Sequence, residues 1–317
     1  MRKIGITIGD PAGVGPELIV KLYEFFHKGN IYIIYGEEKI IREACNLVGR
    51  NIYYEKVEDT SKLNKEGVYL VDLNISETER PLPSLTSGKV AVGYLARAVV
   101  DAVAGNVNAL LTMPISKFWA KRAGFSYEGH TEYLAQVFRV KNFAMMMYSE
   151  KLKIVLLTTH IPLSSVAGLI TKELIDSKLK LIFDEFKRLF KVKPKIGVLG
   201  LNPHAGEGGE IGKEELEIIY PTIEEWKKRG FLVEGPLPPD TAFLNREDYN
   251  VFLCMYHDQG LIPFKILAFK EGVNLTLGLP ILRVSPDHGT AYNIAWKGIA
   301  EVQSSLNALR LIEKISI

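Results

Sequence analysis

The sequence predicts an α/β fold with two domains. At 317 residues the chain is long for a single core, because domains typically hold about 150 residues. Strands and helices alternate from the first residues onward, which is typical of α/β proteins. The stretch YNVFLCMYHDQGLIPFK, residues 249–265, begins with β-forming residues that are apolar on both faces. Such a run indicates a strand buried in a parallel sheet.

The N-terminal segment predicts a βαβ unit. Its strands are expected at Lys3–Ile8, Ile31–Tyr35 and Val68–Val71, and its helices at Pro16–His27 and Glu37–Val48. The turn GDPAGVGPE joins the first strand to the first helix. It is neither a dinucleotide fingerprint nor a P-loop. A phosphate cradle and a tight turn at a sheet edge are both compatible with it.

Thr86 or Ser87 is expected to cap a long helix that ends near Gly105, and a strand is expected at 109–113. Further on, His130 follows Gly129, and Thr131 is placed to cap a helix that begins at Glu132. A lone histidine before a helix is usually a surface residue. Here the adjacent hydroxyl and the free N–H groups of the helix start favour an anion-binding role.

Three histidines follow separate predicted strands in the second half of the chain. His160 follows a predicted hairpin, residues 142–158, and His204 lies in the loop LNPHAGEGGEIG. The four glycines of that loop suit the close approach of a ligand. His257 follows the opening stretch, and Gly260 is expected to turn the chain there. The segment SPDHGTAYNIAWKGIA is expected to open the last helix, which runs toward Ile312.

The shared position of His160, His204 and His257 favours a metal site. Strand ends of one sheet can meet at one edge, where ligands bind in open α/β sheets. Three neutral imidazoles with one open position suit zinc or a similar divalent ion. Zinc is the first expectation, and magnesium or cobalt is the alternative. The alternative is three unrelated structural histidines. Asp258, directly after His257, is placed to assist the chemistry.

Lys265, Asn274 and Arg283 are spaced nine residues apart in apolar surroundings. Burying the two charges is costly without partners, so an anionic substrate group explains them as well as a buried salt bridge does.

The composition excludes several classes of protein. The net charge of +2 comes from 39 basic and 37 acidic residues that are well mixed, so neither nucleic acid nor a membrane surface is expected as a partner. The two cysteines, Cys45 and Cys254, lie in apolar runs and form no disulfide framework. No apolar run reaches the about 18 residues of a membrane span, and no leader precedes the first strand. We therefore expect a cytoplasmic protein that is neither exported nor anchored.

The motifs GDPAGVGPE, GHTEYLAQ, TTHIPL, LNPHAGEGGEIG, MYHDQGLIPFK and GVNLTLGLPILRVSPDHGTA together resemble the 4-hydroxythreonine-4-phosphate dehydrogenases of pyridoxal phosphate biosynthesis. The resemblance spans nearly the whole chain. It implies a two-domain fold of the isocitrate and isopropylmalate dehydrogenase type, with the active-site cleft between the domains. It also implies a homodimer with the active site at the interface.

On this resemblance the reaction is the NAD-dependent oxidation of a phosphorylated hydroxy acid, followed by loss of carbon dioxide. The product is 3-amino-2-oxopropyl phosphate. The family's C-terminal segment returns to the first domain, which implies a first domain of residues 1–132 and 288–317 and a second of residues 133–287.

The family's functional residues map onto this chain position by position. His160, His204 and His257 match the metal ligands, and Lys265 and Asp258 are placed for acid or base chemistry. The positions that match the substrate-binding set are His130, Thr131, Lys265, Asn274 and Arg283. His288, Gly289 and Asn293 lie in a segment that resembles the adenine-side cofactor loop of decarboxylating dehydrogenases.

That segment departs from the usual pattern. Asn293 stands where an aspartate is usual, and Trp296 stands where a glycine is usual. NAD rather than NADP is therefore implied by the family alone. A paralogue that oxidises threonate 4-phosphate, erythronate 4-phosphate or a dihydrodiol is the nearest alternative, and a non-catalytic or hydrolytic metal-binding protein is a more distant one.

Overall fold

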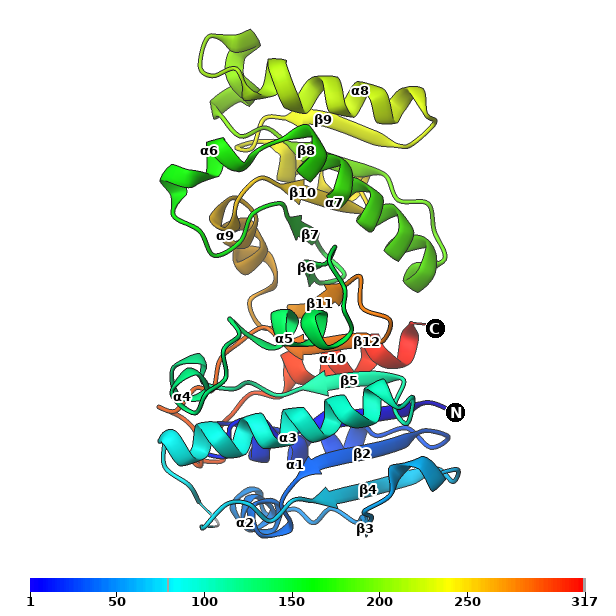
Figure 1. Cartoon of the computed structure of the whole chain (residues 1–317), viewed down its shortest axis with the longest axis vertical. Coiled ribbons are helices and arrows are strands. Elements are labelled where there is room, and N and C mark those ends of the chain that lie inside the picture. Colours follow the sequence, from blue (N-terminus) through cyan, green and yellow to red (C-terminus); the bar gives the residue numbers. More distant parts are fainter. Residues whose placement is uncertain (79, 316–317) are drawn as a thin grey trace. The chain divides into compact units, whose positions relative to one another are not determined.

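The computed structural model describes residues 1–78 and 80–315 (Figure 1). Within these residues the chain divides into two compact units. The first unit combines Met1–Arg139 with Leu279–Lys314, and the second is built from Val140–Gly278. The predicted α/β class is confirmed, whereas the domain boundaries and the cleft between the domains stay predictions. No helix in the described ranges combines the length and the apolar character that crossing a membrane requires.

The first unit is a parallel sheet with helices on both faces. Its strand order is β3-β4-β2-β1-β5-β12, and its neighbouring strands pair in parallel. The bounds of the strands are β1 (Lys3–Thr7), β2 (Ile31–Gly36), β3 (Glu55–Lys56), β4 (Gly67–Asp72), β5 (Ala109–Thr112) and β12 (Leu282–Pro286). The helices are α1 (Gly15–Leu22), α2 (Glu38–Val48), α3 (Leu85–Val103), α4 (Lys117–Arg122), α5 (His130–Val137) and α10 (Gln303–Lys314).

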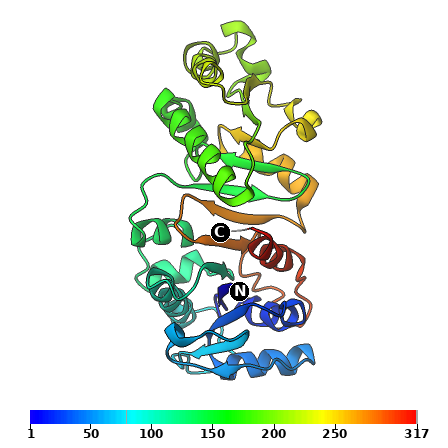
Figure 2. The same cartoon turned by 90° about the vertical axis from the view of Figure 1, so that its right-hand side faces the viewer.

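Figure 2 shows α3, in cyan, on one side of this sheet and α1 and α10, in blue and dark red, on the other. Every residue of β2 is buried. This follows from its sequence IYIIYG, because a strand covered by helices on both faces needs apolar side chains at every position.

The second unit has a mixed sheet with the order β11-β6-β7-β10-β8-β9. β6 pairs in antiparallel fashion with β11 and β7, whereas β7, β10, β8 and β9 are parallel. The bounds of the strands are β6 (Ala144–Tyr148), β7 (Lys153–Leu156), β8 (Ile196–Leu199), β9 (Val233–Leu237), β10 (Val251–Cys254) and β11 (Val273–Leu277). The helices are α6 (Val166–Leu169), α7 (Lys172–Glu185), α8 (Tyr220–Lys228) and α9 (His257–Ala268).

The predicted hairpin is confirmed by the antiparallel pair β6 and β7. All four residues of β10 are buried. A cluster of buried residues joins β10 to β7 and α9, and it includes Ile154, Phe252, Cys254 and Phe264. This core fixes the strand ends from which the predicted metal ligands emerge.

Several predicted helix boundaries were wrong. Ser84, not Thr86 or Ser87, caps α3, and its hydroxyl accepts a hydrogen bond from Ser87 N at 3.1 Å. Gly260 does not turn the chain but lies inside α9, where an added Cβ would come within 2.7 Å of the Ile154 side chain. The glycine therefore permits close packing of α9 on β7.

The start of the last helix was also predicted wrongly. α10 begins at Gln303, so the segment predicted to open it is a loop. Hydrogen bonds to the glycine-rich turn between β1 and α1 hold this loop in place.

Candidate functional site

The three candidate metal ligands follow neighbouring parallel strands of the second unit. His160 comes after β7, His257 after β10 and His204 after β8. These strands lie in the order β7-β10-β8 and all pair in parallel. Each histidine thus follows the carboxyl end of its strand, the edge at which open α/β sheets bind ligands.

The imidazoles of His160 and His257 lie near each other, with ring centroids 5.7 Å apart. His160 and His204 are exposed, and the side chain of His257 is 40% exposed. Among residues 1–78 and 80–315, no three His, Cys, Asp or Glu side chains lie close enough together to hold a metal ion. The chemistry of the donors fits a divalent ion, but its binding requires the histidine side chains to move closer together.

Asp258 contacts one of these histidines directly. Its Oδ1 lies 2.6 Å from Nδ1 of His257. Such a carboxylate contact fixes the orientation and the tautomer of an imidazole and directs Nε2 toward a metal. Asp258 is therefore placed to orient His257.

The loop that carries His204 has an unusual backbone. Consecutive residues have positive φ: 52° at His204, 52° at Ala205, 80° at Gly206 and 45° at Glu207. The left-handed region costs about 1–2 kcal/mol for a residue with a side chain. An added Cβ at Gly206 would lie 2.8 Å from Oε2 of Glu215, so this glycine accommodates a carboxylate of the chain itself. The missing side chain of Gly206 thus makes room for Glu215, and the close approach of a ligand to this loop stays a prediction.

Two candidate substrate-binding residues also belong to the second unit. Lys265 is half-buried on α9, and its Nζ lies 5.7 Å from the centroid of the Phe269 ring. Asn274 lies on β11, and its Oδ1 is buried without a hydrogen-bond partner within the described ranges. A buried amide oxygen without a partner is costly, which suits a group that accepts a hydrogen bond from a ligand.

The other candidate substrate-binding residues come together in the first unit. The guanidinium of Arg283, only 3% exposed, donates to Thr112 Oγ1 from Nη2 at 2.8 Å and from Nε at 3.1 Å. Its Nη1 donates to Thr131 Oγ1 at 3.4 Å. Burial lowers the pKa of Arg283 to about 10, against the opposing charge of Glu132. Arg283 therefore keeps its positive charge at neutral pH.

His130 lies in the positive field of this cluster. Burial, and then the charges of Arg283 and Lys117, lower the pKa of His130 well below its usual range. Its Nε2 is buried and has no hydrogen-bond partner in the part of the chain that the structure describes. A neutral imidazole, a hydroxyl and a buried guanidinium together suit the binding of an anionic or hydroxyl-bearing ligand.

The helix beside this cluster begins earlier than predicted. Gly129 is the N-cap of α5 and His130 is its first residue, so the prediction that Thr131 caps the helix was wrong. Sequence reasoning missed Thr112, which closes β5 beside β12. Its position at the end of a buried strand could have suggested it.

His288, Gly289 and Asn293 lie in the exposed part of the loop between β12 and α10. His288 Nδ1 lies 3.0 Å from the carbonyl oxygen of Gly289. The glycine-rich turn of the N-terminus holds this loop, since Val14 N donates to Thr290 O at 3.0 Å and Tyr292 donates to Asp10 Oδ2 at 2.6 Å. Burial raises the pKa of Asp10, against its hydrogen bonds. The turn thus supports the predicted cofactor loop.

Trp296 explains one departure from the usual cofactor loop. Its φ of 58° is left-handed, the conformation for which a glycine is normally used. Its backbone N donates to Glu17 Oε1 at 3.0 Å, and its indole Nε1 donates to Pro11 O at 3.0 Å. These bonds offset the strain of a large side chain at this position.

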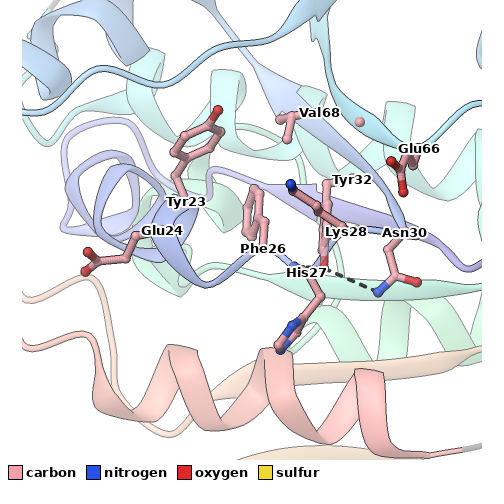
Figure 3. A pocket seen from close by; sticks show the side chains of 10 residues that line it. Tyr23, Glu24, Phe26, His27, Lys28, Asn30, Tyr32, Glu66 and Val68 are labelled. Atoms are coloured by element: carbon pink, nitrogen blue, oxygen red, sulfur yellow. Dashed lines mark hydrogen bonds between the residues drawn. The ribbon is translucent and has the colours of Figure 1, made fainter.

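A pocket of the first unit lies elsewhere (Figure 3). It borders the starts of β2 and β4, and its lining includes Tyr23, His27, Lys28 and Glu66. Figure 3 shows these side chains around the stacked rings of Phe26 and Tyr32, whose centroids are 4.1 Å apart. None of its lining residues is a candidate site residue.

Known proteins similar to this chain share its full length. It is 60% identical over 314 residues to the 4-hydroxythreonine-4-phosphate dehydrogenase of Aquifex aeolicus, covering 99% of this chain and 98% of that protein. A D-threonate 4-phosphate dehydrogenase of Pectobacterium atrosepticum is 36% identical, with 99% of each chain covered.

A solved structure of an enzyme with the same name is also similar to this chain. The crystal structure of 4-hydroxythreonine-4-phosphate dehydrogenase from Klebsiella pneumoniae matches with a TM-score of 0.86 and 35% identity, over 99% of this chain and 97% of that one. The model of the family described as pyridoxal phosphate biosynthetic protein PdxA matches residues 28–312. The chain therefore belongs to the PdxA family, and it is a dehydrogenase of the kind found in pyridoxal phosphate biosynthesis.

Proposed function

We propose that this chain catalyses the NAD-dependent oxidation and decarboxylation of 4-phosphooxy-L-threonine, also called 4-hydroxythreonine 4-phosphate. The products are 3-amino-2-oxopropyl phosphate and carbon dioxide, as a step in pyridoxine 5′-phosphate biosynthesis. The observation that carries the proposal is the 60% identity, over 99% of the chain, to a protein named for this substrate.

His160, His204 and His257 would hold the divalent ion, which is zinc, or magnesium or cobalt. Their places after three neighbouring parallel strands support this role, and Asp258 would orient His257 through Nδ1. When bound, the ion supplies a Lewis acid at the substrate hydroxyl and NAD supplies the hydride acceptor.

Arg283, Thr131 and His130 would bind an anionic group of the substrate. The buried charge of Arg283 supports this, because an anion accepts its hydrogen bonds more strongly than the threonine hydroxyls do. Lys265 and Asn274 would contribute a cation and a hydrogen-bond acceptor, and Lys265 would also serve in acid or base chemistry at the reacting carbons. His288, Gly289 and Asn293 would contact the adenosine part of NAD.

The proposal includes a homodimer in the cytoplasm, with the active site at the interface between subunits. It also includes a first domain of residues 1–132 and 288–317 and a second of residues 133–287, separated by the active-site cleft. Light scattering would test the dimer, with an expected mass of twice the 35.5 kDa of the chain. A mass of one chain would contradict it.

A second candidate activity is the oxidation of threonate 4-phosphate or erythronate 4-phosphate. The D-threonate 4-phosphate dehydrogenase of Pectobacterium atrosepticum is 36% identical over 99% of the chain, which favours this alternative over unrelated ones.

One assay separates the candidates. NADH absorbance is followed after addition of 4-phosphooxy-L-threonine, D-threonate 4-phosphate or 4-phosphoerythronate at equal concentrations, with a divalent metal present. We expect the highest kcat/KM for 4-phosphooxy-L-threonine. A higher value for either other acid would contradict the proposal and establish the alternative.

A further inference from the structure

The loop that carries His204 is folded around a buried carboxylate. Glu215 begins the π-helical segment Glu215–Ile219 that precedes α8, and it is 3% exposed. Its Oε1 accepts hydrogen bonds from the backbone N–H groups of Leu201 at 2.6 Å and Asn202 at 2.7 Å. Its Oε2 accepts from Asn202 Nδ2 at 2.9 Å. Hydrogen bonds to an ionised acceptor are stronger than neutral ones, so Glu215 is a strong anchor for the start of the loop.

The hydrogen bonds of Glu215 lie next to a strained segment of backbone. The left-handed conformation begins at His204, two residues after Asn202, and continues through Gly208. Residues with side chains remain in this region only where the surrounding structure holds them there. The closeness of Gly200 and Gly206 to the same carboxylate, at 3.1 Å and 2.8 Å from an added Cβ, indicates that both limbs of the loop close on Glu215.

A second buried side chain ties this loop to the strand end that carries His257. Gln259 is 8% exposed, and its Oε1 accepts from Met255 N at 2.7 Å. Its Nε2 donates to Gly200 O at 2.7 Å. Gln259 therefore connects the end of β10 to the end of β8. Thr158 Oγ1, which donates to Met255 O at 2.7 Å, extends the connection to the segment that carries His160.

We propose that Glu215 and Gln259 are positioning residues for the metal-binding histidines. Glu215 holds the left-handed loop that presents His204, and Gln259 fixes that loop relative to His257. The inference rests on the proposed metal site, and both residues act through their hydrogen bonds to the backbone rather than as proposed ligands.

Glu215→Gln tests the anchor, because one of its acceptor oxygens becomes an NH2 group that opposes the N–H groups around it. Glu185→Gln is the matched control. Glu185 is also a buried carboxylate of this unit, 6% exposed, and it accepts a backbone hydrogen bond, from Gly278 N at 3.0 Å. Glu185 also accepts two hydrogen bonds from the guanidinium of Arg188, at 2.8 Å and 2.7 Å. Each substitution thus weakens a comparable number of hydrogen bonds to a buried carboxylate, but it is Glu215 that contacts the loop carrying His204.

The readouts are the Kd for Co²⁺ by calorimetry and the visible absorption spectrum of the bound Co²⁺, which reports its coordination. We expect Glu215→Gln to weaken Co²⁺ binding about 10- to 100-fold and to change the spectrum. Glu185→Gln should leave both unchanged. A wild-type Kd and spectrum for Glu215→Gln would overturn the proposal, as would equal weakening by the two variants.

Gln259→Glu provides a second test should Glu215→Gln fail to fold. It keeps the acceptor for Met255 N but replaces the donor to Gly200 O with an oxygen. We expect weaker Co²⁺ binding with the fold retained. If Gln259→Glu bound Co²⁺ with wild-type affinity, Gln259 would not position the loop of His204 relative to His257.

Hydrogen exchange on the metal-free protein separates failure of this inference from failure of the proposed function. Faster exchange at the amides of residues 201–209 in Glu215→Gln than in Glu185→Gln supports the anchor, and equal rates overturn it. If wild-type protein and His204→Ala bind Co²⁺ equally, the proposed metal site fails, and the exchange rates still decide whether Glu215 holds the loop.

Discussion

The proposed substrate-binding cluster of Arg283, Thr112, Thr131 and His130 differs from the three proposed metal ligands in what the structure holds in place. In the first unit, Arg283 is buried and donates hydrogen bonds to Thr112 and Thr131. Contacts within the protein therefore fix the orientation of its side chain. In the second unit, His160 and His204 are exposed, and what is fixed is the backbone beneath them. A buried charge needs protein partners, whereas an exposed imidazole is solvated and needs only a correctly placed backbone.

Removal of one exposed histidine should have the largest effect. His204→Ala deletes a proposed metal ligand while leaving the buried core intact, so we expect metal-dependent turnover to fall about a thousandfold or more. Fold and secondary structure should be retained, since the side chain is exposed. Turnover and bound metal are measured on the same sample. Near-normal activity with one metal bound per chain would refute the ligand assignment.

Removal of the buried cation should have the next largest effect. Arg283→Met keeps most of the side-chain volume but loses the charge and its hydrogen bonds. We expect kcat/KM to fall about 100-fold, because each hydrogen bond to a charged group contributes about 1.5–3 kcal/mol. Co²⁺ affinity should be unchanged, unlike that of His204→Ala.

Arg283→Lys sharpens this test. Lysine restores the positive charge but lacks the planar guanidinium that donates several hydrogen bonds at once, so it should recover only part of the lost kcat/KM. Full activity in Arg283→Met would show that the cluster does not bind substrate.

A smaller effect is expected for Asp258→Asn. The amide keeps the shape of Asp258 but weakens the contact with His257 Nδ1, which lies 2.6 Å from the carboxylate. We expect Co²⁺ affinity to fall about tenfold. Asp184→Asn is the control, because Asp184 is similarly exposed, 60% against 71%, but pairs with Lys180 instead. A similar loss of affinity in both variants would remove the orienting role of Asp258.

The smallest effect concerns the pH dependence of stability. Because the pKa of His130 is lowered on folding, the unfolded chain binds a proton near pH 6 that the folded chain does not. Stability should therefore fall as the pH drops below about 6.5 and be unaffected by this group above it. His130→Asn should flatten the pH dependence of the urea midpoint between pH 5 and pH 6.5. Identical slopes for the variant and wild type would contradict the burial of a neutral His130.

The sequence predicted most of the strands, because a strand buried on both faces has a continuous apolar run, as in β2 and β10. It also predicted that His160, His204 and His257 follow strand ends. Prediction from the sequence failed where one residue type can serve two structural roles. Gly260 was interpreted as a turn, but its missing side chain permits helix packing, and only the positions of neighbouring strands distinguish the two.

Supporting side chains were the least predictable part of the site. Thr112, Glu215 and Gln259 are common residue types in unremarkable sequence surroundings, and their importance comes from what they contact. Glu215 lies 13 residues from Asn202 and still accepts its backbone N–H. Such contacts depend on how the loop folds back, which neither periodicity nor a short motif records.

A crystal structure of the Co²⁺-loaded protein, with anomalous diffraction data, tests the central claim most directly. We predict one anomalous peak per chain, bonded at about 2.0–2.1 Å to imidazole nitrogens of His160, His204 and His257. The bonded nitrogen of His257 should be Nε2, with Nδ1 still in contact with Asp258. A peak bound by any other set of residues, or the absence of a peak in protein that turns over at the full rate, would contradict the account.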